Sequence, residues 1–352
     1  MDDALGMLRE SVERVLAQQV TARATLAAEA NGMDEPAWNQ LRQLGIAGTD
    51  AGEMDFRMHA AVLRASGYAG ALVPYADSEV LGRWLARGAG LDADSDIFAV
   101  SIMADSAAAS RGDRIELALE ERRIPWARHA TAMVFSFTMD GRDYAASVPA
   151  PEIELRHATN MASEPHDIPL AASVTIDLRN AKEVPAAYGP AAVHARGALC
   201  RVIQMEGAIA RINEITLQYS RDRKQFSRSL SQYQVIQSYL AAMAGELCAT
   251  SAAAQRCIAQ GDQHGMEDIA AAKVRAGQAA RTVTAHAHQI HGAIGFTREF
   301  PLQLWTRRLW AWREEFGNEP YWARELGAAI VGRGADALWT HLAKQQQKIT
   351  GT

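Results

Sequence analysis

The sequence predicts a multi-domain α+β protein with an N-terminal helical domain over residues 1–95, a small middle β domain over 96–184 and a C-terminal four-helix bundle over 185–352. Three observations predict this order. Apolar residues recur at helical spacing in the first and last parts of the chain, and short β-type runs bounded by turn residues fill the part between them. A chain of 352 residues that is 48% hydrophobic can also bury more than one core.

The N-terminal domain is predicted to begin with one long helix over residues 3–31. Leu5, Leu8 and Val12 open a series of apolar residues at three- and four-residue steps, and Asn31-Gly32 is a typical helix end. Further helical patterns cover residues 35–44, 55–67 and 77–88. These patterns predict a helical unit that precedes the first strand.

The middle domain is predicted from five short runs of residues with high β propensity. These runs are residues 97–100, 114–119, 132–137, 143–148 and 173–178. Asp140-Gly141 lies between the third and the fourth run and predicts a tight hairpin turn, because both residue types tolerate positive φ.

The C-terminal domain is predicted from four long helical patterns after Pro185. They cover residues 188–222, 230–260, 266–290 and 318–346, and all are rich in alanine, which permits close helix packing. Four such helices predict an antiparallel bundle.

Composition and charge exclude several classes of partner. A net charge of -5 provides no general attraction to nucleic acid or to anionic lipid, and no apolar run approaches the ~18 residues that a membrane span needs. Cys200, Cys248 and Cys257 form no CxxC pair and are predicted to be small core residues in a reducing compartment. The acidic N-terminus lacks the basic and apolar regions of a signal peptide, so a cytoplasmic location is expected.

Three neighbouring histidines do not predict a metal site. His286 and His288 are two residues apart in a predicted helix, where side chains point about 200° away from each other. These two are expected to be ordinary bundle residues, and His291 is expected in the following turn. We therefore expect no metal.

Two segments of the last domain place residues that suit a phosphate group at the ends of predicted helices. Arg223-Lys224-Gln225-Phe226 follows the helix over 188–222, and by itself it is typical of a charged helix end. The segment from Gln289 to Gly295 follows the helix over 266–290, and by itself it is typical of a C-cap and a turn. Its glycines also allow backbone N–H groups to approach a ligand, and a guanidinium suits a diphosphate.

These segments resemble the Arg-x-x-Phe and Gln-x-x-Gly-Gly-x-Gly motifs in the C-terminal domain of the acyl-CoA dehydrogenase family. Gln234 continues the first motif, and the stretch from Phe296 to Pro301 continues the second. The family also shows the α-β-α order, so the resemblance covers essentially the whole chain. Ser227 and Ala293 depart from the pattern, because glycine is usual at both positions.

The resemblance implies that FAD is the cofactor and that its ADP half lies against the bundle. It assigns the diphosphate contact to Arg223 and the adenosine contact to Phe226. The full set of cofactor-binding residues that it implies is Arg223, Phe226, Tyr233, Gln234, Gln289, Gly292 and Ala293. In the family the flavin lies at a subunit interface, with its ring in one subunit and its adenosine end against the helices of the neighbour.

The reaction of the family requires a carboxylate base that this chain does not place as expected. The family removes two hydrogens from the α and β carbons of an acyl-CoA thioester; a carboxylate takes the α proton and flavin N5 takes a hydride. One branch has its base where this chain has Phe316, and another has it where this chain has Gly197. Glu315 would be the catalytic carboxylate if the turn were shifted by one residue, and otherwise it is typical of a solvated turn residue.

The segments that correspond to the flavin-ring side of the family also differ. The family shows Thr-Glu-Pro and Trp-Ile-(Ser/Thr)-Asn segments there, and residues 101–106 and 124–129 of this chain match neither. The sequence therefore retains the neighbour-side residues and lacks the ring-side and base residues.

This asymmetry resembles the short subunit of heteromeric acyl-CoA dehydrogenases, in which a longer partner supplies the base. That first interpretation implies an acyl-CoA substrate, such as a fatty acyl or steroid side-chain thioester, and an electron-transfer flavoprotein or similar acceptor. A second interpretation is a self-sufficient homo-oligomeric dehydrogenase that uses Glu315 or another base that the sequence does not identify. A third is a helical-bundle protein that retains the fold without redox chemistry.

Overall fold

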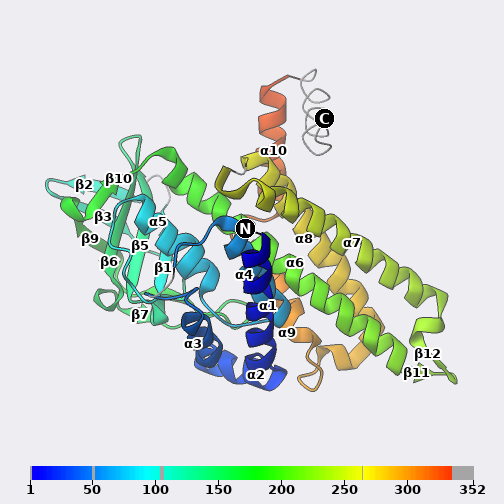
Figure 1. Ribbon diagram of the computed structural model, residues 1–352. Helices are drawn as coiled ribbons and strands as arrows, with labels where there is room; N and C mark the ends of the chain where they lie inside the picture. Colours follow the sequence, from blue (N-terminus) through cyan, green and yellow to red (C-terminus); the bar gives the residue numbers. More distant parts are fainter. Residues whose placement is uncertain (1, 50–51, 104–106, 264, 335–352) are drawn as a thin grey trace.

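The computed structural model describes residues 2–49, 52–103, 107–263 and 265–334 (Figure 1). N-terminal helices, middle β-sheets and C-terminal helices follow one another along the chain, which confirms the predicted fold class. Residues 335–346, the last part of the helix predicted over 318–346, lie outside the described residues.

The N-terminal helices differ from the prediction at one point, the single long helix. They are α1 (Asp2–Gln19), α2 (Ala22–Asn31), α3 (Glu35–Gln43), α4 (Phe56–Ala69), the π-helix η1 (Ala76–Arg83) and α5 (Trp84–Gly88). The prediction of a single helix over 3–31 is wrong. Thr21 has extended backbone angles, and its hydroxyl accepts a hydrogen bond from the Ala24 N–H at 3.1 Å. Thr21 is thus the N-cap of a second helix. Gly32 ends that helix, as predicted.

The middle part contains the five predicted strands. They are β1 (Phe98–Ile102), β3 (Arg114–Ala118), β5 (Ala132–Met139), β6 (Arg142–Pro149) and β9 (Ser173–Asp177). The strands that the sequence did not predict are β2 (Ala108–Arg111), β4 (Ile124–Pro125), β7 (Leu155–Arg156), β8 (His166–Pro169) and β10 (Ala181–Glu183), and all are four residues or shorter. Asp140 and Gly141 both have positive φ, which confirms the predicted hairpin turn between β5 and β6.

The strands form three sheets in the orders β1-β5-β6-β10, β2-β3-β9 and β4-β8-β7. The β1–β5 pair is parallel, and the other pairs in these sheets are antiparallel. Buried residues from all three sheets, among them Ile115, Ile124 and Phe135, share one apolar core. The other face of β1 and β5 packs against η1 and α5 through Phe98 and Leu85.

The described part of the C-terminal region contains one helix more than predicted. Its helices are α6 (Pro190–Asp222), α7 (Gln234–Ala259), α8 (Met266–His291), α9 (Leu302–Glu314) and α10 (Glu319–Gly332). The helix α9 was not predicted, and it packs against α6 and α8. His291 is the last residue of α8 and is buried, so its prediction as a turn residue is wrong.

One apolar core joins the N-terminal helices to the bundle. The helices α4 and α6 lie in close contact, because a Cβ on Gly67 would lie 2.1 Å from the Gln204 carbonyl oxygen and a Cβ on Gly207 would lie 2.2 Å from the Arg64 carbonyl oxygen. In Figure 1 the sheets lie to the left, and α6, α7 and α8 extend away from them to the right. The long helices thus carry one end of the bundle far from the β-sheets.

The cysteine prediction holds for two residues. Cys200 and Cys257 are buried, whereas Cys248 is exposed on α7, so its prediction as a core residue is wrong.

Candidate cofactor half-site and base position

The first candidate site lies at the end of the bundle that is remote from the sheets. There α6 ends at Asp222, and a two-stranded hairpin of β11 (Lys224–Gln225) and β12 (Arg228–Ser229) leads to the start of α7. Phe226 and Ser227 form the turn of this hairpin with φ of 49° and 65°. Positive φ at both positions is typical of a type I′ turn and disfavours residues other than glycine. Such a backbone conformation favours glycine, the residue that the resemblance leads us to expect at position 227.

A surface cavity of about 460 Å³ brings the two predicted motifs together at this end. Arg223, from the end of α6, and Gln289, Gly292 and Ala293, from the end of α8, all line it. The sequence did not predict Tyr219 as a wall of this cavity, although it lies one helical turn before Arg223 and so shares its face of α6.

Three of the predicted cofactor residues lie beside this cavity without lining it. Phe226 is at the tip of the hairpin with 90% of its surface exposed. The Tyr233 hydroxyl donates to the Gln225 carbonyl at 2.9 Å, and the Arg228 guanidinium lies 4.2 Å from the centre of the Tyr233 ring. Gln234 is the first residue of α7 and is exposed.

The cavity fits a diphosphate. Arg223 is exposed, and it has no ion-pair partner in the part of the chain that the structure describes. Gly292 has φ of 63° and ψ of -145°, a conformation that only glycine adopts readily, and a Cβ built on it would meet no atom within 4 Å. An unpaired guanidinium therefore faces a stretch of open backbone, the arrangement that anionic ligands need.

The second candidate site is the place where the resemblance leads us to expect the base, and an aromatic ring fills it. Phe316 lies in the turn between α9 and α10 with φ of 53°. A Cβ built on Gly197 of α6 would lie 2.5 Å from Cδ1 and Cε1 of the Phe316 ring. The two positions at which the resemblance leads us to expect a base thus face each other, and the Phe316 ring occupies the space between them.

Glu315 is not a solvated turn residue, so that interpretation is wrong. Its side chain is only 15% exposed, and its Oε2 accepts a hydrogen bond from Arg201 Nε at 2.7 Å. Its Oε1 lies 2.9 Å from Asn160 Nδ2 and 3.3 Å from His166 Nε2. Burial alone would raise the pKa of the Glu315 carboxyl, but the charges of Arg201 and His166 outweigh this and hold the pKa well below its usual value.

Glu315 belongs to a buried network of charges. Arg201 also binds Asp77 of η1 through Nη2, at 2.9 Å from Oδ2, and it donates to Gln204 Oε1 at 2.7 Å. Asn160 Nδ2 bridges from Glu315 to the buried carboxylate of Glu164, 2.7 Å away. Because removal of one partner would leave buried charges uncompensated, the members hold one another in place.

His166 is charged within this network. Burial lowers the pKa of its imidazole, but the neighbouring Glu315 carboxylate raises it by more, to about 9. The protonated ring therefore balances Glu315 at neutral pH. The sequence carried no signal for this network, because its members are distant along the chain.

The second segment on the predicted ring side forms a tightly held turn. Trp126 is buried with φ of 60°, and the next residues form a short 3-10 helix, Ala127–His129. Arg128 Nε donates to Asp167 at 3.0 Å and fixes this turn to β8. Of the first segment, residues 104–106 lie outside the described residues.

The histidines of α8 make local contacts. The His286 ring stacks on Tyr239 with 4.5 Å between ring centres, and His288 Nε2 lies 3.1 Å from the Thr306 hydroxyl. Within the described ranges no three His, Cys, Asp or Glu side chains are grouped to hold a metal ion. Likewise, no helix in the described part of the chain has the length and apolar character to cross a membrane.

The comparison with protein families identifies the last domain. The family model described as "Acyl-CoA dehydrogenase, C-terminal domain" matches residues 193–328. The chain is similar to 3-sulfinopropanoyl-CoA desulfinase of Paraburkholderia xenovorans (strain LB400), with 38% identity over 95 residues, 27% of this chain and 24% of that protein. It is also similar to acyl-CoA dehydrogenase IpdE2 of Mycolicibacterium smegmatis (strain ATCC 700084 / mc(2)155), with 29% identity over 133 residues, 38% of this chain and 42% of that protein. The aligned stretches thus span less than half of either relative.

Solved structures match nearly the whole chain. The ChsE4-ChsE5 complex from Mycobacterium tuberculosis gives a TM-score of 0.82 at 18% identity and covers 93% of this chain and 97% of that chain. A Tcur3481-Tcur3483 steroid ACAD variant gives 0.83 at 19% identity and covers 95% and 99%. Residues 193–328 are therefore similar to the C-terminal domain of acyl-CoA dehydrogenases, and the described chain has the acyl-CoA dehydrogenase fold.

Proposed function

We propose that this chain is a flavin-assisting subunit of a hetero-oligomeric, FAD-dependent acyl-CoA dehydrogenase. The observation that carries the proposal is the contrast between the two candidate sites. The half-site at the end of the bundle is open and fits a diphosphate, whereas the base position is filled by Phe316 against Gly197. The chain can thus hold one end of a shared cofactor, but within the described ranges it has no free carboxylate at the expected base positions.

The role of this chain toward FAD is to bind and orient it. Arg223 would hold the diphosphate, the open backbone at Gly292 and Ala293 would approach it, and Gln289 would contact the nucleotide. Phe226 at the tip of the hairpin would lie beside the adenosine and across the subunit boundary. When bound, FAD supplies the acceptor for the β hydrogen of the acyl-CoA.

The partner in this proposal is a longer acyl-CoA dehydrogenase subunit that supplies the ring side and the base. Two solved structures with this fold are described by paired names, ChsE4-ChsE5 and Tcur3481-Tcur3483, and the second is called a steroid ACAD. These neighbours support a hetero-oligomer and a bulky acyl group such as a steroid side-chain thioester. We also propose that the assembly contains a bound flavin. An electron-transfer flavoprotein or similar acceptor would reoxidise this flavin.

The outer surface of the bundle supports assembly. Three large apolar side chains around the half-site are exposed: Phe226 by 90%, Val235 by 54% and Phe296 by 71%. Exposed apolar side chains in one region are typical of a surface that another protein covers. Along α7, Gly245 has open space above it, so a neighbouring helix could approach closely there. We therefore propose a dimer or tetramer in which Arg223 and Gly292 face the adjoining subunit.

The self-sufficient alternative rests on Glu315, which is adjacent to the base position. Its carboxylate, however, already accepts bonds from Arg201 and Asn160 and lies beside His166. A carboxylate so stabilised in its charged form is a weak proton acceptor, because a useful base has a pKa near the working pH. The geometry therefore favours the assisting role.

The test is flavin content. The chain is purified alone and after coexpression with a longer acyl-CoA dehydrogenase subunit, and the visible flavin absorbance per protein is measured in both. We expect flavin in the assembled protein and a marked loss in Arg223→Ala, since charge-assisted bonds to a phosphate contribute roughly 1.5–3 kcal/mol, or 10- to 100-fold in affinity.

The matched control is Arg14→Ala on the exposed surface of α1, which should retain flavin. Unchanged flavin in assembled Arg223→Ala would remove the assignment of the diphosphate contact. Absence of flavin from every assembly would instead support the interpretation without redox chemistry.

A further inference from the structure

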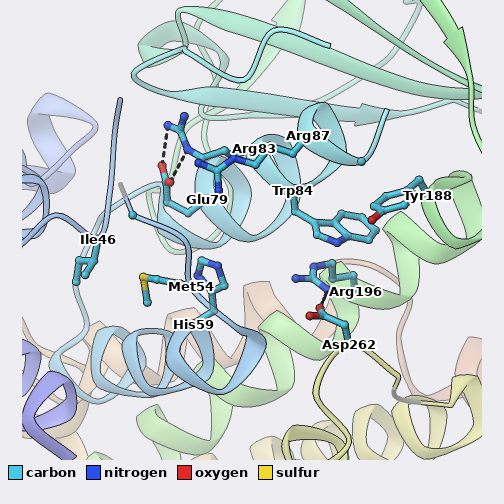
Figure 2. Close-up of a pocket in the computed structure, with 12 residues that line it drawn as sticks. Ile46, Met54, His59, Glu79, Arg83, Trp84, Arg87, Tyr188, Arg196 and Asp262 are labelled. Atoms are coloured by element: carbon cyan, nitrogen blue, oxygen red, sulfur yellow. Dashed lines mark hydrogen bonds and ion pairs between the residues drawn. The ribbon is translucent and has the colours of Figure 1, made fainter. Parts of the chain in front are cut away.

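A second cavity, of about 250 Å³, lies where the N-terminal helices meet the first part of α6 (Figure 2). Residues of α4, η1, α5, α6 and the loop before α8 line it, among them His59, Trp84 and Arg196. Arg196 and Arg223 are 27 residues apart, which corresponds to about 40 Å along a helix at 1.5 Å per residue. The cavity is therefore separate from the half-site at the end of the bundle.

The acidic groups of this cavity are already paired. Glu79 accepts a bond from Arg83 Nε at 2.7 Å and is 3% exposed. Asp262 accepts a bond from Arg196 Nη1 at 2.7 Å. Neither carboxylate is thus left to attract a cation.

Two arginines of the cavity, in contrast, have N–H groups without a hydrogen-bond partner among the described residues. Arg196 is only 4% exposed; its Nε donates to the Val80 carbonyl at 2.9 Å, and its Nη2 has no hydrogen-bond partner among the described residues. Arg87 lines the cavity and has no ion-pair or hydrogen-bond partner within the described ranges. The Arg196 Nη2 atom is not itself fully buried, so a ligand or water in the cavity can accept a hydrogen bond from it.

The walls around these donors are rigid and partly apolar. The Arg196 guanidinium lies 4.3 Å from the centre of the Trp84 ring, and Trp84 packs on Tyr188 with 4.8 Å between ring centres. Figure 2 shows Trp84 and Tyr188 above Arg196, with Met54 and His59 across the cavity. The wall that carries Arg83 is the π-helix η1, an irregularity that is frequent at functional sites.

His59 lines the cavity and adds no charge to it. Burial, and next the charge of Arg196, lower the pKa of the His59 imidazole to about 4, and the opposing influences of Asp262 and Asp55 do not offset them. The imidazole is therefore neutral at neutral pH. Because Glu79, Arg83 and Asp262 are paired, the charged groups left for a ligand are those of Arg87 and Arg196.

We propose that this cavity binds a small organic anion, whose carboxylate or phosphate group is held by Arg87 and Arg196 and whose apolar part lies against Trp84 and Met54. The volume is below the 300–1,000 Å³ usual for drug-sized ligands, so the ligand is a small metabolite. Planar guanidinium groups bind both carboxylate and phosphate groups. The aromatic wall can pack against a ligand whose apolar part is unsaturated or contains a ring.

The experiment measures binding of two probes, inorganic phosphate and benzoate, to the full chain by titration calorimetry, with uncharged benzamide as the matched control probe. All titrations use the Arg223→Gln background, because phosphate could also bind at the half-site. We expect saturable binding of one or both anions and none of benzamide. Binding of phosphate alone identifies a phosphate ligand, and binding of benzoate alone identifies a carboxylate.

Arg87→Gln tests the assignment within the same background. Arg87 is exposed and unpaired, so the variant should fold, and we expect about 10- to 100-fold weaker binding. Arg9→Gln, at an exposed position of α1, should leave the affinity unchanged. The proposal is overturned if neither anion binds saturably at millimolar concentration, if benzamide binds as well as benzoate, or if Arg87→Gln has no greater effect than Arg9→Gln.

Discussion

Substitution of Gly197 by alanine tests whether the Phe316 ring occupies the base position. A Cβ on residue 197 would lie 2.5 Å from Cδ1 and Cε1 and 2.7 Å from Cζ of the ring, so the ring must move. Such overpacking costs roughly 1–3 kcal/mol. Alanine is also favoured over glycine within a helix by about 1 kcal/mol, so the expected net destabilisation is roughly 0–2 kcal/mol.

The informative comparison is with the same substitution after the ring has been removed. In Phe316→Ala the added methyl group meets no ring, so Gly197→Ala should stabilise the protein by about 1 kcal/mol. The two backgrounds should differ by roughly 1–3 kcal/mol in a double-mutant cycle. Gly245→Ala is the matched control, because this α7 glycine has nothing within 4 Å, and it should stabilise both backgrounds equally.

The assay is urea unfolding of the four proteins of the cycle and of the two Gly245→Ala controls, followed by tryptophan fluorescence and by circular dichroism. An equal effect of Gly197→Ala in both backgrounds would refute the claim that Phe316 fills this place.

Three further predictions concern activity, assembly and pH. The chain alone should be slow or inactive in dye-linked oxidation of several acyl-CoA thioesters, because a positioned base contributes roughly 10²–10⁴-fold; brisk turnover that Glu315→Gln abolishes would establish the self-sufficient alternative instead. Light scattering should show a dimer or tetramer with a longer partner, and Val235→Glu should weaken it by placing a charge on an exposed apolar position of α7; a monomer with and without the partner would contradict the assembly. The folded-state pKa of His166, about 9, lies above its ordinary 6.5, so its contribution is fully present below pH 6.5 and is lost as the pH rises through 9. A shift of this size corresponds to about 3 kcal/mol. The difference in unfolding free energy between the wild type and His166→Gln should therefore shrink between pH 6.5 and 9, and a constant difference would show that His166 is not charged in the native state.

Local patterns predicted most of the fold. Helix periodicity located α3, α4, α6, α7 and α8, and the Asp140-Gly141 signal located the β5–β6 turn. The break at Thr21 was missed because the apolar spacing continues across it, although threonine is a common N-cap. The helix α9 was missed although Leu302, Trp305 and Leu309 recur at helical steps and are buried. In both cases the local information was present in the sequence.

The contacts of the candidate base position could not be predicted from the sequence. The burial and the ionisation of Glu315 depend on a network with Asp77, His166 and Arg201. These residues are far apart along the chain and meet only through the packing of η1, β8 and α6. Spacing within one segment carries no information about such contacts. A charged residue in a turn is usually solvated, and here a buried arginine reverses that expectation.

Symmetry strengthens the argument for a different partner. If the open half-site serves FAD, the ring side of that cofactor must come from the adjoining subunit. In a two-fold symmetric dimer of this chain, the adjoining subunit would present the same ring-side and base positions that this chain has. Those positions carry Phe316 packed on Gly197, and the nearby carboxylate of Glu315 is bound to Arg201. Among the described residues, a second copy of this chain thus offers no free carboxylate at these positions, which supports our proposal that the adjoining subunit is a polypeptide of different sequence.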